Sequence, residues 1–360
     1  MAKSTTTDLL RRLRADGHIE QRDLEAICTR AGSTSMQPKA LWYLQVFLLF
    51  GALIAGILCT AGFAAIFRGD FTDTAMLGFG AFYIGVAVAL HRLTDNLFLS
   101  HLALALSIGG HGFFLFGVSQ KAGHDDALVA IFLGSLVLCA ALYPIYRMTL
   151  HRTASCVLVF VLAKIASNDP PMPIVCHVLV AVATATSAWI LARRRCRPAL
   201  MPLAYGCVIG LVILTLPISE RGLWFEEFAM QRPWIASIVL AVALLFALHR
   251  AAPDGVRTQA RLAIIVVGGV LALAVLTMPG ILAALFLAVL GHAMWHPIVA
   301  WIGLGSLPIA LWHYFYSLDQ TYAQKSMTLV ASGVLLLAAR FVMSKSGNTT
   351  TTSASRGDVA

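Results

Sequence analysis

The segment SIGGHG, residues 107–112, places the imidazole of His111 among glycines in the middle of a long apolar run. Gly109, Gly110 and Gly112 weaken a helix locally, because glycine is a poor helix former. Transporters build substrate sites from interrupted helices with polar groups at membrane depth, so His111 and its glycines are a candidate binding or transport site. The alternative is that the glycines permit close helix packing, while the imidazole hydrogen-bonds a neighbour.

The segment YFYSLDQTYAQKS, residues 314–326, places Asp319 and Lys325 between two long apolar runs. Thr321 and Gln324 have the spacing of a capping box, which predicts that a helix starts between the two charges. Lys325 then falls in the first turn, where the helix dipole disfavours a cation, and Asp319 is placed to offset it. Both are candidate outer-face functional or docking residues. The alternative is that they only cap and pair at a helix start.

Two further pairs have spacings that could support chemistry. His292 and His296 in GHAMWHP stand four positions apart, as two metal ligands on one helix face do. No glutamate follows His292 and no third ligand is evident, so we predict no metal site. Glu226 and Glu227 lie in the segment 219–234, which is typical of an amphipathic helix at a membrane surface. Their carboxylates could serve acid–base chemistry or form the solvated face of that helix.

The composition indicates that all these residues belong to a membrane protein. Of the 360 residues, 59% are hydrophobic and 12% are charged, whereas soluble domains have about 45–50% and about 25%. The mean hydropathy is +0.81. Apolar runs of about twenty residues alternate with short charged segments, which predicts a chain that crosses the bilayer many times.

The sequence lacks the short motifs of common enzymes and cofactor sites. It has no Walker A, G-x-S-x-G or HExxH pattern and no haem or iron–sulfur spacing. The seven cysteines stand singly, and we interpret them as small apolar residues. We therefore predict no cofactor, no metal and no enzymatic activity.

Twelve apolar segments are candidate membrane spans, which predicts an all-α, polytopic fold. Their approximate limits are 41–67, 74–90, 98–118, 127–146, 153–166, 172–192, 198–218, 234–248, 262–278, 281–294, 298–314 and 325–343. Lys164 lies near the outer end of the short fifth segment, and we expect its ammonium to extend to the membrane surface. The ninth and tenth segments are separated only by the turn Pro279-Gly280.

The loop charges predict the orientation of these spans. With the N-terminus inside, 20 of the 26 Lys and Arg fall on the cytoplasmic side, five fall outside, and Lys164 lies within a span. This alternation follows the positive-inside rule, so we predict that both termini are cytoplasmic. It also explains the net charge of +9 without a nucleic-acid partner.

Polar segments flank the membrane domain predicted over 40–343. Residues 1–39 contain two amphipathic patterns that each end at a glycine, which predicts a cytoplasmic helical hairpin. Residues 344–360 are rich in Ser, Thr and Gly, which predicts a disordered cytoplasmic tail.

The C-terminal part of the chain resembles an uncharacterised bacterial membrane family, the domain of unknown function numbered 4401. The resemblance rests on MPGILAAL (278–285) and LWHYFYSLDQTYAQKSMTLVASGVLLLAAR (311–340). The chain departs from the family pattern at Tyr322-Ala323, where leucines are usual. The resemblance implies a bacterial inner-membrane protein, often encoded beside a small membrane protein with a GDYxxLxY motif. It implies no known activity and no catalytic residue.

These observations leave three hypotheses for function. The leading one is a non-enzymatic component that acts with the small partner membrane protein. The alternative is a transporter or channel for a small solute with a site near His111; the lack of Asp and Glu in the predicted spans disfavours proton or sodium coupling. The third is an intramembrane enzyme acting on lipid, which would need the outer acids to meet Lys325 or His313 in one pocket.

Overall fold

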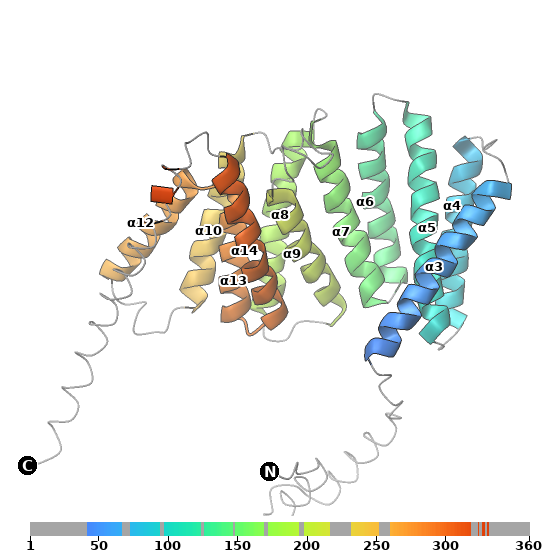
Figure 1. The fold of residues 1–360 in the computed structure, drawn as a ribbon, viewed down its shortest axis with the longest axis horizontal. Coiled ribbons are helices and arrows are strands. Elements are labelled where there is room, and N and C mark those ends of the chain that lie inside the picture. Colours follow the sequence, from blue (N-terminus) through green and yellow to red (C-terminus); the bar gives the residue numbers. More distant parts are fainter. Residues whose placement is uncertain are drawn as a thin grey trace, which may run out of the picture. The chain divides into compact units, whose positions relative to one another are not determined.

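The fold is described by a computed structural model, in which the described part of the chain is helical and contains no strand (Figure 1). The predicted all-α fold class is therefore confirmed. The described residues are 42–66, 73–93, 97–123, 126–146, 148–168, 172–193, 198–216, 232–251 and 260–317, with the single positions 323, 326, 327 and 330.

Several predicted segments lie outside the described residues. They are the helical hairpin over 1–39, the tail over 344–360, the part 219–231 of the amphipathic segment, and nearly all of the last predicted span, 325–343. The boundaries of the membrane domain and of its two flanking segments therefore stay predictions.

The chain divides into two compact units. The first consists of Met1–Thr72 and Gly78–Phe113, and the second of Asp73–Leu77 and Phe114–Ala360. The described part of the first unit contains α3 (Trp42–Ile66), most of α4 (Asp73–Leu93) and the start of α5 (Leu97–Ala122). The second contains α6 (Ala127–Ile145), α7 (Thr149–Ile165), η1 (Ala166–Asn168), α8 (Met172–Ala192), η2 (Pro198–Leu200), α9 (Met201–Thr215), α10 (Pro233–Ala251), α12 (Ala260–Leu276), α13 (Pro279–Ala293) and α14 (Pro297–Ser317).

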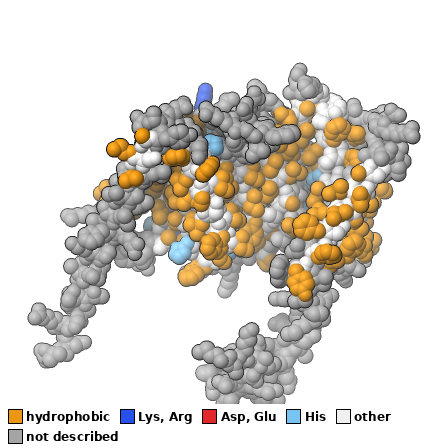
Figure 2. All heavy atoms as spheres, viewed as in Figure 1, with side chains coloured by type: hydrophobic (Ala, Val, Ile, Leu, Met, Phe, Trp, Pro, Cys, Tyr) orange, Lys and Arg blue, Asp and Glu red, His pale blue; other side chains and the backbone are white. Residues whose placement is uncertain are grey.

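Seven of the described helices are long and apolar enough to cross a membrane. They are Thr74–Leu93, Phe98–Ala122, Ala127–Ile145, Met172–Ala192, Pro198–Thr215, Pro233–Ala251 and Pro297–Phe315. Hydrophobic side chains cover much of the described surface in Figure 2, as a lipid environment requires. The chain is therefore a multi-pass membrane protein. The finer prediction of about twelve spans with both termini cytoplasmic stays a prediction.

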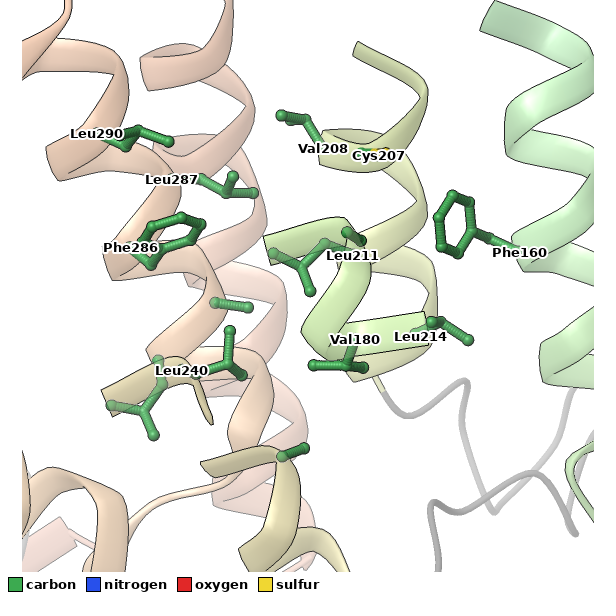
Figure 3. Packing of buried hydrophobic residues seen from close by; sticks show 14 of the residues in the cluster. Phe160, Val180, Cys207, Val208, Leu211, Leu214, Leu240, Phe286, Leu287 and Leu290 are labelled. Carbon is green, nitrogen blue, oxygen red and sulfur yellow. The ribbon is translucent and has the colours of Figure 1, made fainter. Parts of the chain in front are cut away.

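The core of the second unit surrounds α13, whose first six residues are all buried. Figure 3 shows large side chains from α7, α8, α9 and α10 directed toward the same interior as those of α13. The labelled members of this core are Phe160, Val180, Cys207, Val208, Leu211, Leu214, Leu240, Phe286, Leu287 and Leu290.

Glycines set the close approach of helices in this core. Gly206 and Gly210 form a GxxxG pair on α9, for which the sequence predicts a packing role. A Cβ at Gly206 would lie 2.6 Å from the Cβ of Cys156, and one at Gly210 would lie 2.6 Å from Cε2 of Phe160. Both contacts are on α7, so the predicted packing role of the pair is confirmed. This packing turns one face of α7 toward α9.

Candidate functional site

His111 lies in a helix that the SIGGHG segment does not interrupt. The α5 helix runs continuously from Leu97 to Ala122. A Cβ at Gly110 would lie 2.9 Å from Cγ1 of Ile84 and 3.0 Å from the carbonyl oxygen of Gly80, both on α4. Gly112 is exposed, and a Cβ added there would meet no other atom within 4 Å. Of the predicted glycines, Gly110 therefore holds two helices close together, while Gly112 does not.

The imidazole of His111 is buried and directed along its own helix. Its side chain is 5% exposed. Nδ1 lies 2.7 Å from the carbonyl oxygen of Ser107, one turn earlier. A carbonyl can only accept, so Nδ1 carries the proton that it donates in this bond. The role of His111 as a binding or transport residue stays a prediction.

Lys164 does not extend to the membrane surface, so that prediction is wrong. Its side chain is 4% exposed. Its Nζ donates to the carbonyl oxygen of Leu214 at 3.3 Å, in the last turn of α9. The reason is the packing of α7 on α9, which places Lys164 on the covered face of its helix. The last carbonyls of a helix lack intrahelical partners and carry partial negative charge, so they stabilise an ammonium.

The end of α9 also meets the start of α13. A Cβ at Gly280 would lie 3.0 Å from the carbonyl oxygen of Thr215, the last residue of α9. Ser167 follows Lys164 in η1 and is 4% exposed. Lys164 therefore lies at a buried junction formed by the ends of α7 and α9 with the first turn of α13. The described residues place no carboxylate in an ion pair with it.

A second polar group lies at the opposite end of α7, where α6 ends. It consists of Tyr143, Tyr146, His151 and Arg152, which we call the junction cluster. The rings of Tyr146 and His151 stack with their centres 4.1 Å apart. The Arg152 guanidinium carbon lies 4.7 Å from the centre of the Tyr143 ring, and its Nε donates to the carbonyl oxygen of Tyr146 at 2.8 Å.

The junction cluster is tied to the connection before α9. The hydroxyl of Tyr143 donates to the carbonyl oxygen of Ala199 in η2 at 2.6 Å. Thr153, one residue after Arg152, donates to the carbonyl oxygen of Pro202 at 3.3 Å. These bonds join the end of α6, the start of α7 and the start of α9 into one polar layer.

The His292–His296 pair does not lie on one helix. The α13 helix ends at Ala293, and Trp295 adopts a positive φ of 58° between the two histidines. His292 is exposed and His296 is half-buried. Among the described residues, no three His, Cys, Asp or Glu side chains are grouped so that they could hold a metal ion.

The family profile described as "Domain of unknown function (DUF4401)" matches residues 41–346. The chain belongs to this family. The resemblance found in the C-terminal segment thus extends over every described helix of the DUF4401 chain, from α3 to α14. No curated protein and no solved structure matches it significantly.

Four predicted residues of the DUF4401 chain lie outside the described residues. They are Asp319, Lys325, Glu226 and Glu227. Their assignment to the outer face, and a pocket joining the outer acids to Lys325 or His313, therefore stay predictions. Half-buried His313 itself lies near the end of α14.

Sequence reasoning missed the junction cluster of the DUF4401 chain. Arg152 is only one of the 20 Lys and Arg that the loop charges place on the cytoplasmic side. The available signal was the segment YPIYRMTLHR (143–152), in which two tyrosines precede a histidine–arginine pair at the start of a helix with no acidic residue. An arginine in the first turn opposes the helix dipole and therefore calls for a physical reason.

Proposed function

We propose that this DUF4401 protein is a non-enzymatic component of the bacterial inner membrane that acts by binding a small partner membrane protein. The loop charges support an orientation with both termini in the cytoplasm. The family resemblance supports a partner that carries a GDYxxLxY motif. The observation that carries the proposal is the uncovered surface of α12.

Among the described helices, α12 packs mainly on α10, and most of its described side chains are exposed. Residues 264–269 are all exposed, whereas Val270 is buried. Gly268 and Gly269 lie in this exposed stretch, and neither would meet another atom within 4 Å if it carried a Cβ. Glycine disfavours a helix by about 1 kcal/mol relative to alanine. In membranes small residues let a second helix approach closely, so a single-span partner on this face would account for both glycines.

A photo-crosslinking residue at Leu271, 53% exposed on α12, is expected to capture the GDYxxLxY protein in native membranes. The same residue at Val137, 65% exposed on α6, is the control and is expected to capture only lipid. The adduct is measured by its mass and by peptide identification.

Gly268→Ile should abolish the adduct at Leu271, because the larger side chain blocks the close approach of the partner helix. Gly305→Ile, at an equally open glycine of α14, should leave the adduct unchanged. The proposal fails if both crosslinking positions yield the same products.

A second candidate function is passage of a small polar solute near His111. The burial of its imidazole in a membrane helix favours this candidate, because ionisable groups at membrane depth are often functional. We expect His111→Ala to change the permeability of proteoliposomes to small polar solutes, measured by light scattering, at unchanged protein abundance. Gly112→Ala is the matched control, because a methyl group there meets open space. Low abundance of His111→Ala that His111→Gln restores would instead assign the residue to packing.

A further inference from the structure

Arg152 is buried in a place that disfavours a cation. It lies in the first turn of α7, where the helix dipole is positive, and no acidic residue accompanies it. The side chain is 9% exposed. Its guanidinium has five N–H donors, and in the described part of the chain only Nε is bonded, to the carbonyl oxygen of Tyr146. The remaining donors thus have no hydrogen-bond or ion-pair partner among the described residues.

The start of α7 places two more donors at the same end of the helix, the amides of Thr149 and Leu150. Met148 occupies the N-cap position and makes no capping bond with its side chain. The amide of Arg152 donates to the carbonyl oxygen of Met148, whereas the amides of Thr149 and Leu150 have no hydrogen-bond acceptor among the described residues. Long helical side chains point toward the N-terminus of their helix, which directs the guanidinium back to these amides. The open donors of a largely buried side chain and two amides at a helix start together favour an anion.

The depth and surroundings of this site indicate a lipid phosphate. The span Ala127–Ile145 ends between Tyr143 and Tyr146 of the junction cluster, so the cluster lies at a membrane boundary. The bond from Tyr143 to Ala199 joins it to η2, which follows the arginine run 193–197 in the sequence. In that run the guanidinium carbon of Arg193 lies 3.8 Å from the centre of the Trp189 ring. Basic groups between membrane helices at the cytoplasmic face are typical binding sites for anionic headgroups.

We propose that the junction cluster binds the phosphate group of an anionic phospholipid. The guanidinium of Arg152 presents paired N–H donors to two phosphate oxygens, a geometry that lysine cannot reproduce. The amides of Thr149 and Leu150 bind a further oxygen. Tyr143 and Tyr146 hold the guanidinium in place through the ring contact and the carbonyl bond.

The test measures lipid binding to the full-length protein in detergent by native mass spectrometry and by thermal shift. Phosphatidylglycerol and cardiolipin should bind and raise the Tm, whereas phosphatidylcholine should not. Arg152→Gln should weaken binding of the anionic lipids by about 10- to 100-fold, since it removes charged hydrogen bonds. Arg250→Gln is the matched control, because Arg250 is also stacked on an aromatic ring but is exposed at the end of α10. Equal affinity in Arg152→Gln and Arg250→Gln would overturn the proposal.

A second variant keeps the test decisive if Arg152→Gln does not fold. Met148→Asp places a carboxylate at the N-cap of α7, where it bonds the first-turn amides and occupies the anion position. The variant should fold normally and lose the thermal shift caused by anionic lipid. A thermal shift that persists in this variant contradicts the site. Inorganic phosphate is tested in the same way as the lipids. If it raises the Tm as much as phosphatidylglycerol does, the ligand is a soluble phosphate and the assignment to lipid is wrong.

Discussion

Replacing Gly303 with alanine is expected to lower the free energy of unfolding by about 1–3 kcal/mol, as overpacking of a tight core does. Gly303 lies on α14 against α13, which runs beside it (Figure 1). A Cβ there would overlap the backbone nitrogen of Ala288 and lie 2.8 Å from the carbonyl oxygen of Ala284. Backbone atoms cannot rotate aside, so the two helices must separate along their contact.

Gly305→Ala is the matched control for this prediction. Gly305 lies two residues further along α14, is exposed, and would meet nothing within 4 Å if it carried a Cβ. Its replacement should leave the stability unchanged or raise it by up to about 1 kcal/mol, because alanine is the better helix former. The measurement is the Tm of both purified variants in one detergent. Equal Tm values would show that the α13–α14 contact is looser than the structure describes.

The ends of the helices could be predicted from the sequence because local signals mark them. The predicted spans 127–146 and 172–192 agree with α6 (Ala127–Ile145) and α8 (Met172–Ala192) to within one residue. A break between the ninth and tenth predicted spans is also found, but the turn is Thr277-Met278, because α12 ends at Leu276 and the predicted turn residues Pro279 and Gly280 are the first two residues of α13. Charges, prolines and glycines interrupt the apolar runs at these positions, and such signals act over a few residues of chain.

The inward-facing sides of the helices could not be predicted in the same way. In a bilayer both the lipid-facing and the packed faces are apolar, so the sequence pattern does not distinguish them. The burial of Lys164 and Arg152 could not be predicted for this reason. Both lie near helix ends, where a long basic side chain can reach water. Only the packing of α7 on its neighbours shows that both side chains instead bond backbone carbonyls inside the protein.

Lys164→Glu is expected to lower the free energy of unfolding by about 3–5 kcal/mol, as leaving an unpaired buried charge does. The carboxylate would face the carbonyl oxygen of Leu214 at the negative end of α9, where the ammonium now donates a hydrogen bond. Lys121→Glu is the matched control, because Lys121 is exposed in the last turn of α5. Its change should stay within about 0.5 kcal/mol, since it is a surface substitution.

Lys164→Met separates the charge of the lysine from its volume. Methionine fills a similar space without a buried charge and leaves only the carbonyl of Leu214 without its partner, a loss of about 1 kcal/mol. We therefore expect the wild type to have the highest Tm, Lys164→Met a slightly lower one and Lys164→Glu a much lower one. All three are measured in one detergent, together with Lys121→Glu. If Lys164→Glu instead unfolds at the temperature of Lys121→Glu, the side chain at position 164 reaches water. The extended lysine that the sequence predicts would then be the correct description.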